Sequence, residues 1–114
     1  MPEKYIISRL QNNTYQYKLT AKNGQIILLA QGYKSIEDCE SVIGLVRMNV
    51  QIDGLIDRKI AKNKLFYFEI KTGNGKIIGT SGIYSSIFTR ESGIQAVRKY
   101  AQLAPIIVET VAIV

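Results

Sequence analysis

The sequence predicts an α+β fold in which two β-β-β-α repeats form one pseudo-twofold antiparallel domain, with a barrel-like closure as one form the sheet could take. Residues 15–50 align without a gap on residues 66–101, and twelve of the 36 aligned positions are identical. In each copy a stretch of strand-like residues reaches an Asn-Gly pair and is followed by an apolar stripe with helical spacing. A duplicated unit covers the apolar face of its copy, so we expect one shared core.

The first unit, residues 1–52, is predicted to hold three strands and a helix. Strands are expected at residues 4–10, 15–22 and 25–30, and the second of these alternates apolar and polar side chains. Asn23 and Gly24 both accept positive φ, which predicts a two-residue type I′ hairpin. Ser35 stands where a helix N-cap belongs, and the apolar stripe that follows runs to Val50.

The second unit, residues 53–114, begins at the Asp53-Gly54 break and repeats this order. Strands are expected at residues 55–61, 65–72 and 76–81, followed by a helix that Ser86 caps and Pro105 ends. Gly93 inside this helix costs about 1 kcal/mol relative to Ala, which indicates close packing or a late helix start. The β-branched residues from position 106 onward predict a last strand at a sheet edge.

Composition indicates a basic protein of one domain. The chain has 114 residues, 15 Lys and Arg against 9 Asp and Glu, and a formal charge of +6. This balance permits acidic partners such as nucleic acid or anionic lipid, and solubility is the simpler explanation. The single cysteine, Cys39, can form no internal disulfide and is expected to be a buried hydrophobe. Without a signal peptide or a run long enough to span a bilayer, we expect a soluble cytoplasmic protein.

The residue types argue against an enzyme. Histidine is absent, which removes the commonest general base and the usual zinc ligand sets. The carboxylates of Glu37, Asp38 and Glu40 fall in the first turns of a helix, where solvated charges stabilise the helix dipole. The glycines of residues 73–75 fit a turn and lack the context of a phosphate loop. We therefore predict no catalytic residue, metal or cofactor.

Two sets of residues are candidates for binding. Arg47 and Arg98 are equivalent in the two helices, where they could grip an anion across a groove or lie on the helix surface near the C-terminal turns. Tyr33 and Tyr84 are equivalent at the change from strand to helix, where they could contact a ligand or pack locally.

A basic stretch offers an alternative function, the binding of single-stranded DNA or RNA. Phe66 and Phe68 alternate with Tyr67 and are expected in the core, so Tyr67 is the aromatic left for base stacking. The same residues could instead form a solvated edge that deters strand aggregation. Between positions 58 and 76, Glu69 is the single acidic residue. The candidates for nucleic-acid binding in this stretch are Arg58, Lys59, Lys62, Lys64, Tyr67, Lys71 and Lys76.

The chain resembles the YegP-like proteins, small bacterial and archaeal proteins with one or two copies of a short unit and no established function. The resemblance rests on an alternating strand that ends in Asn-Gly, a return strand, a Tyr before the capping Ser, and Ile-x-x-Val-Arg in the helix. These are Asn23-Gly24, Tyr33, Ser35 and Ile43 to Arg47 in the first copy, and Asn74-Gly75, Tyr84, Ser86 and Ile94 to Arg98 in the second.

The resemblance implies that single-copy members are homodimers of the same shape, so a tandem chain is expected to be a monomer. Each copy departs from the family pattern at one position: the family's Ser is kept as Ser81 but replaced by Ala30, and its Asn is kept as Asn49 but replaced by Tyr100. No catalytic residue is implied. The leading hypothesis is a non-enzymatic binding or accessory module of unknown ligand, whose partner could be nucleic acid or another protein, and no membrane is involved.

Overall fold

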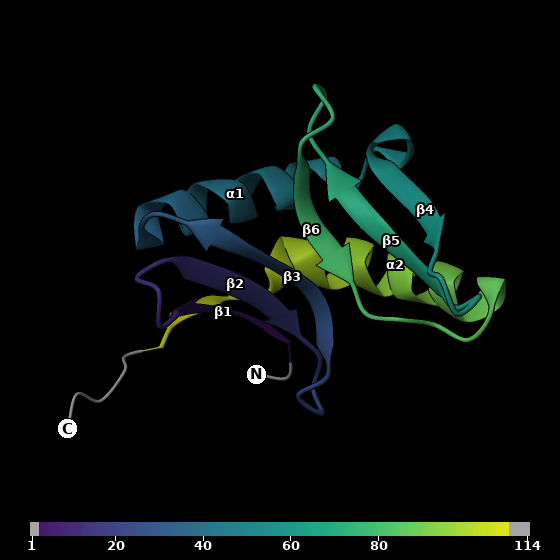
Figure 1. The fold of residues 1–114 in the computed structure, drawn as a ribbon, viewed down its shortest axis with the longest axis horizontal. Coiled ribbons are helices and arrows are strands. Elements are labelled where there is room, and N and C mark those ends of the chain that lie inside the picture. Colours follow the sequence, from purple (N-terminus) through teal and green to yellow (C-terminus); the bar gives the residue numbers. More distant parts are fainter. Residues whose placement is uncertain (1–2, 110–114) are drawn as a thin grey trace.

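The computed structural model describes residues 3–109, which form one seven-stranded sheet with two helices packed against one face (Figure 1). The first repeat contributes β1 (Lys4–Arg9), β2 (Tyr15–Thr20), β3 (Ile26–Tyr33) and α1 (Ile36–Asn49). A short 3₁₀ turn, η1 (Asp53–Leu55), leads to the second repeat: β4 (Ile56–Ile60), β5 (Phe66–Lys71), β6 (Ile77–Ser81), α2 (Ile87–Leu103) and β7 (Ile106–Val108).

The two repeats join through their third strands. The strand order is β4-β5-β6-β3-β2-β1-β7, and Leu29 pairs directly with Thr80 where β3 meets β6. These two residues occupy equivalent positions in the repeats, 51 residues apart as in the alignment. The pseudo-twofold axis therefore passes between Leu29 and Thr80.

One core lies between the sheet and the helices. Tyr5, Tyr17 and Leu28 from the first repeat, and Phe68 and Ile94 from the second, are all fully buried in one cluster. Burying a side chain of this size contributes about 1.5–3 kcal/mol relative to its exposure, and each repeat depends on the other for that burial. The prediction of a shared core is confirmed.

The α+β fold built from two repeats is confirmed, and the sheet is open rather than closed into a barrel. Among residues 3–109 its edges are β4 and β7. The last strand lies at an edge as expected, where it pairs with β1 in parallel, and its predicted continuation beyond residue 109 lies outside the described residues. The boundary at residues 52 and 53 stays a prediction. No helix within the described part of the chain is long and apolar enough to cross a membrane.

The prediction of a two-residue hairpin at Asn23-Gly24 is wrong. Ala21 N donates to the Gln25 carbonyl at 2.8 Å and Gly24 N to the Ala21 carbonyl at 2.9 Å, which closes a three-residue loop. Of the two residues only Gly24 has positive φ, at 85°, whereas a type I′ turn needs two such residues. The same bonding pattern closes the other three hairpins, with Asn13, Lys64 and Gly75 at the positive-φ position.

Both helices begin at the predicted caps. The Ser35 hydroxyl accepts a hydrogen bond from Asp38 N at 3.0 Å, and Ser86 forms a capping box with Thr89. Since α2 starts at Ile87, Gly93 does not mark a late start. A β-carbon on Gly93 would overlap the ring of Tyr84, so the glycine allows this close approach.

Candidate binding cleft

The two central strands of the sheet meet briefly and then diverge. β3 pairs with β6 only at Leu28–Ser81 and Leu29–Thr80. Beyond this point β3 continues to Tyr33 with β2 as its sole partner strand, and β6 from Ile77 to Gly79 pairs only with β5. The sheet is therefore split on one side of the pseudo-twofold axis.

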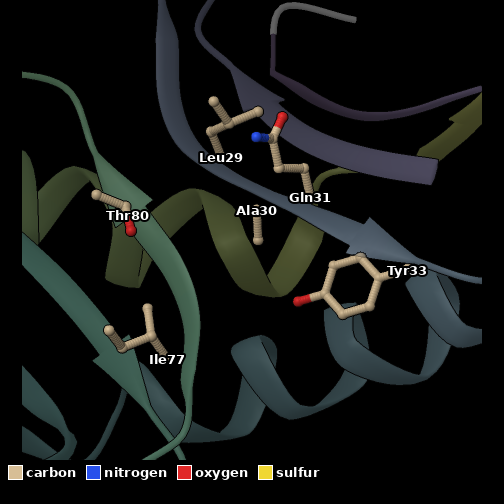
Figure 2. A pocket seen from close by; sticks show the side chains of 6 residues that line it. All are labelled: Leu29, Ala30, Gln31, Tyr33, Ile77 and Thr80. Atoms are coloured by element: carbon tan, nitrogen blue, oxygen red, sulfur yellow. The ribbon is translucent and has the colours of Figure 1, made fainter. Parts of the chain in front are cut away.

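A cleft of about 310 Å³ occupies this split (Figure 2). The Tyr33 side chain points from the end of β3 across the opening between the two strands. The lining contains apolar, amide and hydroxyl groups and no charged side chain: it consists of Leu29, Ala30, Gln31, Tyr33, Ile77 and Thr80. Burial, with the nearby Cys39 thiol as a smaller cause, raises the pKa of Tyr33, so its hydroxyl stays protonated at neutral pH.

The core side of the split is bridged by a buried tyrosine. Tyr17 of β2 reaches beneath β3 and donates its hydroxyl to the Ile78 carbonyl at 2.5 Å. A β-carbon on Gly79 would lie 2.7 Å from the Tyr17 hydroxyl oxygen, which explains a glycine at this position of β6. The hydroxyl thus satisfies a carbonyl of β6 that has no partner on β3.

Tyr84, the equivalent of Tyr33, has a different environment. Its ring packs over Gly93 and lies parallel to Phe68, with the ring centroids 6.1 Å apart. In the first repeat Val42 stands at the position of Gly93, and its side chain is buried. The slot that holds Tyr84 is therefore closed to Tyr33, which faces the cleft instead.

Arg47 and Arg98 form a reciprocal pair of contacts between the helix ends. Arg47 donates to the carbonyls of Gln102 at 2.6 Å and Ala104 at 2.9 Å, and Arg98 donates to the Val50 carbonyl at 3.0 Å. Gln102 donates to the Arg47 carbonyl, and its equivalent Gln51 donates to the Arg98 carbonyl. These cations satisfy carbonyls at the C-terminal end of the opposite helix, where the macrodipole favours them. Anion binding by this pair stays a prediction.

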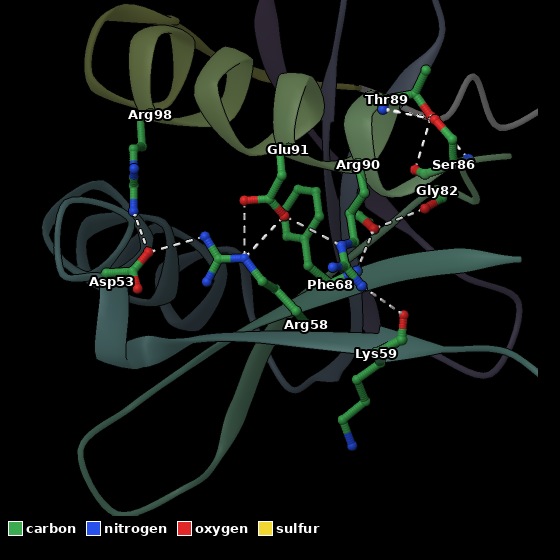
Figure 3. A network of polar contacts seen from close by, with 11 residues as sticks. Asp53, Arg58, Lys59, Phe68, Gly82, Ser86, Thr89, Arg90, Glu91 and Arg98 are labelled. Atoms are coloured by element: carbon green, nitrogen blue, oxygen red, sulfur yellow. Dashed lines mark hydrogen bonds and ion pairs between the residues drawn. The ribbon is translucent and has the colours of Figure 1, made fainter.

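Much of the basic stretch is engaged in ion pairs. Arg58 contacts Asp53 at 3.0 Å and Glu91 at 2.9 Å in a network that extends to Arg98 and Arg90 (Figure 3). The remaining basic residues of this stretch fall into two groups. Lys59 and Lys71 lie in ion pairs with Asp57, and Lys59 is also 3.4 Å from the buried Glu69. Lys62, Lys64 and Lys76 are exposed in hairpin turns or beside one.

These contacts leave little of a stacking surface. Phe68 is fully buried, as expected, and Phe66 is half-buried beneath the Arg90 guanidinium, which lies 5.4 Å from the ring centroid. Tyr67 is also only half-buried, and its strand neighbour is Lys59. The nucleic-acid alternative is not supported by this arrangement.

The remaining candidates for reactive chemistry are the Cys39 thiol and a metal site. Cys39 is buried, and burial together with Asp38 and Glu40 raises the pKa of its thiol to about 11. A protonated, covered thiol is a poor nucleophile. Within residues 3–109 no group of three His, Cys, Asp or Glu side chains is placed to hold a metal ion.

Comparison with known proteins places this fold in a family. The profile of the "Domain of unknown function (DUF1508)" matches residues 11–57 and again 61–107. The chain belongs to this family. It is 36% identical to a UPF0339 protein of Acinetobacter baylyi over 90% of this chain and 92% of the other, and 36% identical to the UPF0339 protein YegP of Escherichia coli over 81% and 84%.

Solved structures in the family share the whole architecture. The solution NMR structure of YegP from E. coli, described as a protein of unknown function, superposes with a TM-score of 0.89 at 31% identity and covers 98% of this chain and 97% of that one. A UPF0339 protein of Shewanella oneidensis gives a TM-score of 0.86 at 32% identity and covers 95% and 92%. The resemblance predicted from the repeated motif is confirmed, and the family is one of unknown function.

The two departures from the family pattern have separate surroundings. Ala30 lines the cleft, whereas the hydroxyl of its equivalent Ser81 accepts from Phe68 N at 2.9 Å and donates to the Gly82 carbonyl at 2.7 Å. The second departure, Tyr100, is half-buried, whereas its equivalent Asn49 is buried and donates to the Lys71 carbonyl at 3.0 Å. Only the first of these positions therefore belongs to the cleft.

Sequence reasoning found one cleft residue in six. Tyr33 was a candidate because it recurs as Tyr84, but its neighbours Leu29, Gln31, Ile77 and Thr80 were not selected. No signal in the sequence points to these residues: the equivalence of Leu29 and Thr80 follows from the repeat, but their pairing is seen only in the structure.

Proposed function

We propose that the protein is a non-enzymatic binding module and that its ligand site is the cleft between β3 and β6. The observation that carries the proposal is the broken pseudo-symmetry at Tyr33. Its equivalent Tyr84 is packed over Gly93, whereas Tyr33 faces an open cleft beside the axis. Pockets that combine apolar surface with a few convergent polar groups are the usual form of a ligand site.

The lining indicates an uncharged ligand. Leu29, Ala30 and Ile77 supply apolar surface, and the hydroxyls of Tyr33 and Thr80 supply hydrogen bonds. A charged ligand group would lose water in this cleft without gaining a counter-ion, which is costly. A neutral ligand with an apolar body and hydrogen-bonding groups at its rim fits these side chains best.

The absence of an enzymatic role is part of the proposal. General acid-base catalysis works best with a group that titrates near the working pH. Tyr33 is the titratable side chain among the cleft residues, and its pKa is raised above the ordinary value. The cleft is thus suited to hold a molecule rather than to transfer its protons.

We also infer that the chain acts as a cytoplasmic monomer. The two repeats already cover each other's apolar faces, so no second chain is needed to complete the core. The sole cysteine is buried and unpaired, which suits a reducing compartment. Light scattering at micromolar concentration should give the mass of one chain, and a concentration-dependent dimer would contradict this part of the proposal.

The cleft can be tested by NMR with ¹⁵N-labelled protein and a library of small uncharged fragments. We expect bound fragments to shift the amide signals of Leu29 to Tyr33, Ile77 and Thr80. Replacing Ile77 by Ala should weaken the binding of such a fragment by about 1 kcal/mol, or roughly fivefold in affinity, because methylene contacts are lost.

The repeat provides a matched control for this variant. Ile26 is the equivalent of Ile77, and its exposed fraction is similar, 41% against 46%, but it lies outside the cleft. Ile26→Ala should leave fragment affinity unchanged. Equal weakening by both variants, or fragment shifts confined to other surfaces, would contradict the proposed site.

A further inference from the structure

The cleft is bordered by strand backbone as well as by side chains. Ala30 and Gln31 of β3 pair with Tyr17 and Gln16 of β2 on one side and with no strand on the other. A strand with one bare side presents N–H and C=O groups that can pair with another chain. This edge lies inside the sheet, next to the cleft, rather than at its rim.

The facing strand is less available. The carbonyl of Ile78 on β6 already accepts the Tyr17 hydroxyl at 2.5 Å, so part of this edge is satisfied from the core side. Ile78 is also the residue at which the β5–β6 register shifts, which breaks the regular spacing of backbone groups. β3 also shifts its register against β2, at Gly32, so the regular segment open to a ligand is limited to Ala30 and Gln31 of β3.

The outer edges of the sheet are protected in ways that the β3 edge is not. β4 carries Asp57, Arg58 and Lys59 in consecutive positions, and all three take part in ion pairs. Such charges deter a further strand. β7 is only three residues long. The β3 edge, by contrast, is flanked by the uncharged side chains of Leu29 and Tyr33.

From these observations we propose that the ligand of the cleft is an extended peptide segment of another protein, with uncharged side chains, which adds to β3 at Ala30 and Gln31. This inference rests on the proposed function, since it names the ligand of the same cleft. Backbone hydrogen bonds to β3 supply binding, and Ile77, Leu29 and Tyr33 contact alternate side chains of the peptide. Charged side chains at those positions are disfavoured because the lining offers them no counter-ion.

The test uses a positional-scanning library of hexapeptides that are built from uncharged residues, acetylated at the N-terminus and amidated at the C-terminus. The peptides are titrated into the ¹⁵N-labelled full chain. We expect the best members to shift the amides of Ala30 to Tyr33 and to slow amide hydrogen exchange on β3. N-methylation of alternate peptide nitrogens removes donors without removing side chains, and it should weaken binding at least tenfold. Ile77→Ala should weaken it severalfold, and Ile26→Ala should not.

Each other outcome overturns the inference. Equal affinity for the N-methylated peptide would mean that backbone pairing does not drive binding. Shifts confined to β4 or β7 would place the peptide at an outer edge, and concentration-dependent shifts of the protein alone at β3 would identify a second copy of the chain as the occupant. Should the uncharged fragments bind the cleft while no library peptide does, the peptide fails and the proposed function stands. If neither binds, both fail.

Discussion

Tyr33 and Tyr84 show how one residue position can take two roles. Tyr33 ends β3 and Tyr84 follows β6, both precede a capped helix, and the sequence around them is repeated. The two repeats differ at the helix position over which Tyr84 packs, which is Gly93 in the second repeat and the buried Val42 in the first. A single methyl-bearing side chain in a close-packed interior is enough to displace a ring.

This explanation predicts opposite effects for the same substitution at two glycines. Gly93→Ala should destabilise the fold by about 1–3 kcal/mol, because the new methyl overlaps Tyr84. Gly44 lies in α1 and is exposed, and a β-carbon added there would meet no side chain or other element within 4 Å, so Gly44→Ala should stabilise by up to about 1 kcal/mol through helix propensity. Urea unfolding followed by circular dichroism measures both, and a stabilised Gly93→Ala protein would refute the account.

The hairpin residues give a second prediction at this scale. Lys64 has φ of 63°, where a side chain costs about 1 kcal/mol or more, and the matching position in two other hairpin loops of the chain holds glycine. Lys64→Gly should raise the free energy of unfolding by about 0.5–1 kcal/mol. Gly75→Ala, at φ of 88°, should lower it by about 1 kcal/mol. If both changes had the same sign in urea titrations, backbone strain would not be the cause.

At the scale of elements, the sequence predicted what is local and missed what is not. The repeat, the strand order along the chain, and the Ser35 and Ser86 caps follow from short patterns, and all are present. The turn type was wrong because Asn23-Gly24 is compatible with two loops that differ by one residue. The cleft could not be foreseen from either strand, since it depends on how far β3 and β6 stay paired, a contact across 51 residues.

The contacts between the helix ends are a third prediction. Arg47→Ala should lower the free energy of unfolding by about 1–3 kcal/mol, because it leaves the Gln102 and Ala104 carbonyls without this charged donor. The exposed Lys22→Ala should change it by less than about 0.5 kcal/mol. Sulfate titration separates the alternatives: if Arg47 and Arg98 grip an anion, sulfate should stabilise the natural protein and not the variant. No effect of Arg47→Ala on unfolding would exclude the structural role.

For the whole molecule, one apolar core holds the two repeats together, and the second repeat carries an ion-pair network of its own. Asp53 links Arg58 of β4 to Arg98 of α2, and Glu91 of α2 continues the network. The first repeat has no counterpart for this network, because Ile7 stands at the position of Arg58 and Cys39 at that of Arg90. Acid should therefore destabilise the whole domain through the ion pairs of the second repeat.

The pH dependence of unfolding tests this. Hydrogen bonds from Arg58, Arg98 and Lys71 lower the pKa values of Asp53, Asp57 and Glu91, so their contribution is present above the unfolded pKa of about 4 and is lost as pH falls through the folded values. At the other end, burial raises the pKa values of Tyr5 and Tyr17, whose contribution is complete below about pH 10 and is lost above it. The free energy of unfolding should thus be level from about pH 5 to 9 and decline on both sides, with each buried tyrosine adding a slope of about 1.4 kcal/mol per pH unit above pH 10.

Urea titrations across pH 2–11 measure the profile. Asp53→Asn should flatten its acid side and leave the alkaline side unchanged. A profile that stays level below pH 4 in the natural protein would mean that these ion pairs do not contribute to stability.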